Sequence, residues 1–156
     1  MGPGEPFTGY FEHRLDKKGR VSMPSQFREV LREHGSADQM VLIAPYGGKA
    51  CFRAFSQDGH RMYLMDLRER EYASSAEREA VWRHFTTGAR PILIEPDGRI
   101  TLGPRIRERL GLPNGGELSL AGFGRTFEIW SRDIFYRDVG PPDEPAMIDI
   151  DLGDLL

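Results

Sequence analysis

Alternating apolar and polar residues mark the first predicted strand, which spans residues 7–15. Phe11, His13 and Leu15 fall on one side of this segment, and the residues between them fall on the other. Alternation with a period of two is typical of a half-buried strand. A tight turn follows, and the apolar-polar-apolar triplet at residues 21–23 predicts a return strand. Together the two segments predict a β-hairpin.

A helical pattern begins at Pro24. Phe27, Val30 and Leu31 lie on one side of this predicted helix, and charged residues occupy the other side. Gly35 stands where a C-terminal cap is expected. Two further strands are predicted at residues 40–44 and 51–55.

Between residues 56 and 88 the spacing of apolar residues stays helical, and Ser74-x-x-Glu77 has the form of a capping box. We therefore expect two connecting helices here instead of an unstructured linker. The remaining predicted elements repeat the earlier order: strands at 91–94 and 100–102, a helix from Pro104 to Gly111, strands at 117–121 and 127–130, and a short helix capped by Ser131.

The stretch around the first turn returns once in the second half of the chain. The first copy, residues 15–24, reads LDKKGRVSMP, and the second, residues 94–104, reads IEPDGRITLGP. Each copy has an acid at the start of the turn and Gly-Arg at its end. The match continues at the same offset, pairing Phe27, Arg28, Glu29 and Leu31 with Ile106, Arg107, Glu108 and Leu110. Such a repeat predicts an architecture of two similar halves.

This repeat divides the chain into four predicted segments. They are a flexible, Gly/Pro-rich N-terminus (1–6), a first repeat with a connector helix (7–75), a second repeat (76–139) and an acidic tail expected to be flexible (140–156). A half of about 75 residues buries too little surface to be comfortable alone. We expect each half to need the other.

The formal net charge of −3 is unevenly distributed. All 21 Lys and Arg lie before residue 138, together with 18 of the 24 acids. Of these cations 18 are arginine, whose planar guanidinium suits bidentate contact with phosphates and guanine edges. A compositional bias toward arginine explains the count equally well. The tail holds the other acids: Asp138, Asp143, Glu144, Asp149, Asp151 and Asp154.

The single cysteine, Cys51, excludes an internal disulfide and fits a reducing compartment. Apolar stretches are short and interrupted by charges, so neither a transmembrane span nor a secretory signal is expected. These features predict a cytoplasmic protein that does not contact membranes.

Few residues suggest catalysis. The four histidines show no metal-ligand spacing with each other or with Cys51, which is expected to be a small buried residue. Gly122-Phe123-Gly124-Arg125 lacks a phosphate-loop or dinucleotide pattern and predicts a turn. No pair of carboxylates stands apart from ordinary surface acids. We therefore expect a protein that is not an enzyme, with no catalytic residue, metal site or cofactor.

The two turns differ in charge. Asp16 and Arg20 are placed to bond across the first turn, and a simple turn staple accounts for both of them. It does not account for Lys17 and Lys18 at the tip. A β-hairpin with cations at its tip is typical of strand-type DNA readers. The second turn, residues 95–99, has more acids than cations, so phosphate attraction is expected mainly at the first.

Several motifs in order carry a resemblance to a known family. Asp16 and Arg20 match an Asp-x-x-x-Arg motif embedded in Leu-Asp-x-Lys-Gly-Arg-apolar-x-apolar-Pro, and the RHFTTGA stretch at residues 83–89 and Glu128-Ile129-Trp130 match later segments. From about residue 7 to 136 the chain resembles the MraZ family, transcriptional regulators of the bacterial division and cell-wall gene cluster in the AbrB-like superfamily. The second motif departs from the family pattern, with Glu95 in place of aspartate.

The resemblance implies an α+β, mainly β fold: a duplicated, swapped-hairpin (AbrB-like) double-split β-barrel with short helices. It also implies a ring-shaped homo-oligomer, associated with the nucleoid, that binds direct repeats in promoter DNA. Asp16, Arg20, Glu95 and Arg99 are carried over from the family motif. With the cations added from the residues themselves, the predicted DNA-binding set is Arg14, Asp16, Lys17, Lys18, Arg20, Glu95 and Arg99.

A second hypothesis is a ring-shaped protein-interaction scaffold or an antitoxin-like module that binds a partner enzyme. The acidic, apolar segment 147–156 suits docking of a partner protein. The same tail could instead compete with DNA for the basic turns. The sequence leaves both roles open.

Overall fold

The computed structural model describes residues 6–143; residues 1–5 and 144–156, which include most of the acidic tail, lie outside this range. The elements run in the order β1 (Tyr10–Leu15), β2 (Arg20–Ser22), α1 (Ser25–Glu33), β3 (Gln39–Ile43), β4 (Cys51–Phe55), α2 (Gln57–Glu69), α3 (Ser75–Thr86), β5 (Arg90–Leu93), β6 (Arg99–Thr101), α4 (Pro104–Leu110), β7 (Gly116–Gly122), β8 (Phe127–Ser131) and α5 (Arg132–Asp138). The α+β class is confirmed. "Mainly β" underrates the helices, because the connecting helices α2 and α3 run for 13 and 12 residues.

The strands form two antiparallel sheets. The larger has the order β1-β7-β8-β4-β3-β5, and the smaller consists of β2 and β6. In the two halves, β1 to β4 correspond in order to β5 to β8. Replacing each strand of the large sheet by its counterpart gives the same strand order read in the opposite direction. Four of the pairings, β1–β7, β2–β6, β3–β5 and β4–β8, join one half of the chain to the other. The two halves are therefore interleaved about an approximate two-fold axis.

The predicted simple hairpins are wrong in their pairing. Both tight turns are present, but β1 pairs with β7 while β2 pairs with β6. Pairing across the halves places Val21 opposite Ile100, and both side chains are buried. Strands β2 and β6 have only three residues each, so a hairpin with the preceding strand would have only a short ladder of hydrogen bonds. Burial in the core shared by the two halves therefore decides the pairing. The first strand also begins later than predicted, because Gly9 has a φ of 93° and Phe7 forms only an isolated bridge to Gly124.

Matched residues of the repeat fill the main core. Phe27 and Leu31 of α1, and Ile106 and Leu110 of α4, are buried at equivalent places. The Phe27 ring stacks on the Phe127 ring with centroids 4.5 Å apart. The helices that follow the two turns therefore close the core around both sheets.

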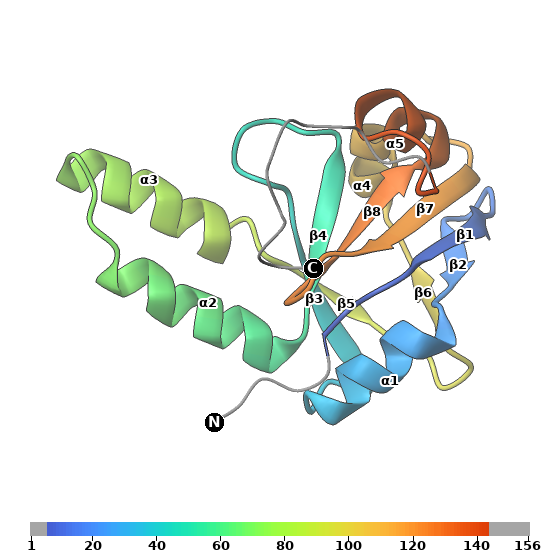
Figure 1. The fold of residues 1–156 in the computed structure, drawn as a ribbon, viewed down its shortest axis with the longest axis horizontal. Helices are drawn as coiled ribbons and strands as arrows, with labels where there is room; N and C mark the ends of the chain where they lie inside the picture. Colours follow the sequence, from blue (N-terminus) through green and yellow to red (C-terminus); the bar gives the residue numbers. More distant parts are fainter. Residues whose placement is uncertain (1–5, 144–156) are drawn as a thin grey trace, which may run out of the picture.

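Helices α2 and α3 project from one side of the molecule, and both tight turns lie on the opposite side (Figure 1). A separate apolar cluster, including Phe55 and Phe85, holds the two helices to the sheet. The predicted caps are confirmed: the hydroxyl oxygens of Ser74 and Ser131 accept from Glu77 N (3.1 Å) and Ile134 N (3.5 Å). Within residues 6–143, none of the helices has the length and apolar character needed to cross a membrane.

Candidate nucleic-acid interface

Strands β2 and β6 form a short two-stranded ribbon, called the arginine ribbon below. Its register places Arg20 opposite Thr101 and Ser22 opposite Arg99. All four of these residues are exposed, whereas the central pair faces the core. Because alternate residues of a strand point to opposite faces, Arg20 and Arg99 lie on the same outer face. The two arginines of the repeated motif therefore share one surface.

The first turn, residues 16–20, is organised by the carboxylate of Asp16. Its Oδ1 accepts hydrogen bonds from the backbone N–H of Lys18 (2.9 Å) and of Arg20 (2.8 Å). Its Oδ2 accepts from Nε of Arg20 at 2.9 Å, so the predicted bond across the turn is confirmed. These contacts, the Arg20 backbone N–H first, lower the pKa of Asp16 below its ordinary value.

The second turn, residues 95–99, has the same backbone path with a different carboxylate. Gly98 N donates to Glu95 O and Glu95 N donates to Arg99 O, both at 2.8 Å, and the equivalent bonds of the first turn are 3.0 Å long. Asp97, and not Glu95, accepts from the backbone N–H of Arg99 (3.1 Å). The Arg99 Nε lies 3.8 Å from Asp97 Oδ2. Arg99 is therefore held less closely than Arg20.

The ribbon brings the two turns together. A shallow depression on the surface is lined by Arg20 and Thr101 together with residues of the second turn, namely Glu95, Pro96, Asp97 and Arg99. The arginine of the first motif thus lies beside the acids of the second. A ligand on this surface would contact both halves of the chain at once.

The cations near the ribbon differ in availability. Lys17 and Lys18 are exposed, and their ammonium groups have no hydrogen-bond or ion-pair partner among residues 6–143. Arg14, on β1, is paired with Glu117 of β7 at 3.2 Å. The pair offsets the charge of Arg14, so the unpaired positive charge is concentrated at the tip of the first turn.

Comparison with known proteins identifies the family. The transcriptional regulator MraZ of Paenarthrobacter aurescens is 36% identical over 129 residues, covering 83% of both chains. The MraZ regulator of Syntrophobacter fumaroxidans is 33% identical over 134 residues, covering 85% of this chain and 84% of that one. The chain belongs to the MraZ family. No family model matches the chain. The MraZ regulator of Cereibacter sphaeroides (strain KD131) is 30% identical over 154 residues, covering 90% of this chain and 88% of that protein.

Sequence reasoning missed three residues of this MraZ-family surface. Asp97 takes the turn-organising role expected of Glu95, two positions away. Arg28 and Arg107 lie against the turns from α1 and α4: Arg28 Nη2 is 3.5 Å from Pro96 O of the second turn, and a Cβ placed at Gly19 of the first turn would overlap Arg107 Nη1. Arg28 and Arg107 stand at the same distance after the two copies of the motif, and this repetition could have marked them as candidates. That each arginine reaches the turn of the opposite half could not be predicted from the sequence.

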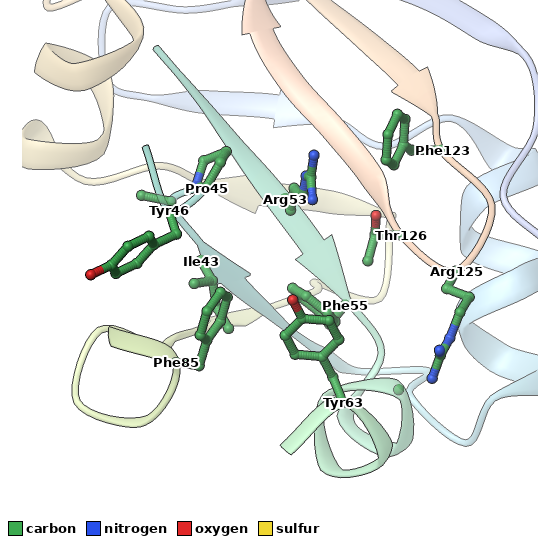
Figure 2. Close-up of a pocket in the computed structure, with 12 residues that line it drawn as sticks. Ile43, Pro45, Tyr46, Arg53, Phe55, Tyr63, Phe85, Phe123, Arg125 and Thr126 are labelled. Carbon is green, nitrogen blue, oxygen red and sulfur yellow. The ribbon is translucent and has the colours of Figure 1, made fainter. Parts of the chain in front are cut away.

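A separate cavity of about 350 Å³ lies between α2 and the sheet, far from the turns (Figures 1 and 2). Figure 2 shows aromatic rings around it, from Tyr46, Phe55, Tyr63, Phe85 and Phe123. Its two arginines already face carboxylates: Arg53 Nε is 3.5 Å from Glu128, and Arg125 is 3.4 Å from Asp66. No histidine, cysteine or carboxylate lines it, so it has no nucleophile with an adjacent base.

Chemically reactive groups are not gathered elsewhere in the described part of this MraZ-family chain. Residues 6–143 contain no cluster of three or more His, Cys, Asp or Glu side chains that could hold a metal ion. Cys51 is buried, as expected, and its burial raises the pKa of the thiol to about 12. The thiolate needed for nucleophilic chemistry is therefore scarce at neutral pH.

Proposed function

We propose that the protein is a transcriptional regulator that binds double-stranded DNA through the arginine ribbon and the first turn. One observation carries the proposal: pairing of β2 with β6 puts Arg20 and Arg99 on one exposed face, beside the unpaired cations Lys17 and Lys18. A two-stranded ribbon fits the major groove, where arginine reads guanine by a bidentate contact. The MraZ relatives are transcriptional regulators, which agrees with this role.

The proposed contacts divide by charge. Lys17 and Lys18 neutralise phosphates, and Arg20 reaches a base edge while Asp16 holds it in place. Arg99 is a second base contact of lower weight, because Glu95 and Asp97 repel phosphate around it. Arg14 contributes only where its pair with Glu117 opens.

The finer parts of the proposal come from the family resemblance. The target is the division and cell-wall gene cluster, and the operator consists of direct repeats in a promoter, bound by a ring-shaped homo-oligomer associated with the nucleoid. Interleaved strand pairing supports an AbrB-like swapped-hairpin, double-split β-barrel. The acidic tail either docks a partner protein or competes with DNA for the first turn.

A mobility-shift titration with the DNA upstream of the protein's own gene tests the function. We expect a specific complex that resists competition by a shuffled sequence of equal length and composition. Removing Lys17 and Lys18 together should weaken both complexes, and Arg20→Ala should weaken mainly the specific one. Equal binding to both sequences by the unaltered protein would contradict sequence-specific regulation and favour the scaffold or antitoxin-like alternative.

A further inference from the structure

Arg28 and Arg107 occupy equivalent positions on α1 and α4, and each lies against the turn of the other half. The backbone links are also crossed: Leu102 N donates to Gly19 O at 2.7 Å, and Met23 N donates to Gly98 O at 2.9 Å. Each turn is therefore supported by residues that are distant in sequence. Neither arginine belongs to the Asp-x-x-x-Arg motif.

Arg107 contacts the first turn closely. Its hydrogen bonds go to carbonyls of its own half, where Nη1 donates to Leu102 O at 2.6 Å and Nε to Pro113 O at 3.3 Å, and its contact with the first turn is made at Gly19. A Cβ added at Gly19 would overlap both Leu102 O and Arg107 Nη1, so the guanidinium lies directly against the turn. Leu102 thus links Arg107 to the first turn: its carbonyl oxygen accepts from Arg107, and its N–H donates to Gly19 O.

Arg28 contacts the second turn directly, through one long hydrogen bond. A Cβ at Gly98 would lie 2.5 Å from Arg28 Nη1, yet the one hydrogen bond of this guanidinium to the turn, to Pro96 O, is 3.5 Å long. The first turn also has an additional support. A Cβ at Gly115 would come within 2.6 Å of Leu15 O, so the loop before β7 lies close to the start of the first turn.

We propose that Arg107 and Arg28 are positioning residues for the DNA-binding turns, each fixing the turn of the opposite half: Arg107 through Leu102, which is bonded to Gly19 O, and Arg28 through Pro96 O. Arg107 is the more important of the two, because its hydrogen bonds are shorter. The inference rests on the proposed function. A turn already held in its binding conformation loses less entropy when DNA binds. The planar guanidinium of Arg107 bridges the carbonyl oxygens of Leu102 and Pro113 at once. The single ammonium of lysine does not reproduce this geometry.

Amide hydrogen exchange of the full chain without DNA tests the positioning itself. Arg107→Lys keeps the charge and removes the bridging contact. We expect exchange at Lys18, Gly19 and Arg20 to become about tenfold faster, since each lost hydrogen bond to a charged group is worth roughly one such factor. Exchange at Gly98 and Arg99 in the second turn should not change. Arg28→Lys should have the opposite distribution, with a smaller effect.

Arg105→Lys is the matched control, because Arg105 is an exposed arginine of the same helix with no hydrogen-bond or ion-pair partner among the described residues. It should leave both turns unchanged. Amides of β4 and β8 report the stability of the whole fold. If those amides also exchange faster in Arg107→Lys, the effect is general unfolding and the proposal is overturned.

DNA binding separates positioning from direct contact. For a positioning residue, Arg107→Lys and Arg107→Gln should both weaken specific binding about tenfold, without changing the slope of log K against log salt. The proposal is wrong if Arg107→Lys binds normally while Arg107→Gln lowers that slope by about one, because Arg107 would then be a phosphate contact. If the first turn loosens while no variant of either turn alters DNA binding, positioning stands and the proposed function fails.

Discussion

At the scale of single residues, Asp16 explains how an acid can belong to the surface that we propose binds DNA. The carboxylate accepts two backbone N–H groups of its own turn and the Nε of Arg20. A carboxylate facing phosphates would weaken binding, so its contribution is to fix the direction of Arg20. The acid and the arginine of the motif therefore act as one unit.

The pKa of Asp16 provides the first prediction. It is lowered from the ordinary value of 3.8, with the Arg20 backbone N–H as the largest cause. Because the pKa of Asp16 is lower in the folded state than in the unfolded state, the ionised carboxylate stabilises the fold at pH values above the unfolded-state pKa. This stabilisation is lost as the pH falls through the folded-state pKa. We expect the carboxyl carbon of Asp16 to titrate below pH 3.8. In Arg20→Ala the midpoint should rise only in part, because the backbone donor remains; a complete return would show that the side chain dominates.

Binding isotherms across a salt series test how the residues share the work. Removing Lys17 and Lys18 together should flatten the slope of log K against log salt by up to about two and weaken all sequences alike. Arg20→Ala should cost roughly 1–3 kcal/mol of discrimination between operator and mismatched DNA. Arg99→Ala should cost less, since Asp97 and Glu95 adjoin it. A loss from Arg99→Ala as large as that from Arg20→Ala would contradict this ranking.

At the scale of elements, the close approach of the first turn to Leu102 predicts the effect of adding one methyl group. Gly19 and Gly48 both have a φ of 86°, but nothing lies within 4 Å of a Cβ at Gly48. Gly48→Ala should therefore cost only the backbone strain, about 1–2 kcal/mol. Gly19→Ala adds overlap with the Leu102 carbonyl and should cost roughly 2–5 kcal/mol. Urea denaturation of both variants measures the difference, and equal losses would show that the turn shifts freely.

Local patterns were enough to predict the elements themselves. The helix caps and the C-terminal glycines depend on a few neighbouring residues, so Ser74, Ser131 and Gly111 could be read from the sequence. The strand bounds differ from the prediction by a residue or two, apart from the first strand. There, Gly9 interrupts the extended chain at a place where the apolar alternation continues.

Long-range pairing was not accessible in the same way. Each arm of the ribbon has only three residues, and period-two alternation does not specify which partner a strand chooses. Likewise, the motif alone pointed to Glu95, whereas the side chain of Asp97 is the one that reaches the Arg99 amide. The contacts of Arg28 and Arg107 with the opposite turns could not be predicted either, because they form only when the two halves are interleaved.

At the scale of the whole molecule, interleaving predicts that neither half folds alone. Four strand pairings join the halves, and the core contains matched residues from both. Residues 1–75 expressed separately should be unfolded or aggregated by circular dichroism and gel filtration, because about 75 residues without those partners bury too little apolar surface. A soluble half with a cooperative melting transition would contradict this expectation.

Assembly is the last prediction. A single chain offers one arginine ribbon, so an operator of several repeated boxes is best engaged by a symmetric oligomer, in which each bound box raises the effective concentration at the next. Four large apolar side chains are also 57–68% exposed in the single chain, as expected of surfaces that other copies cover: Tyr46, Met65, Leu93 and Phe123. Sedimentation should give a mass several times 17.7 kDa. The variant lacking Lys17 and Lys18 should keep that mass while losing DNA affinity, because none of these apolar residues belongs to the first turn. A monomer at micromolar concentration would rule out the ring and leave each ribbon to bind its box alone.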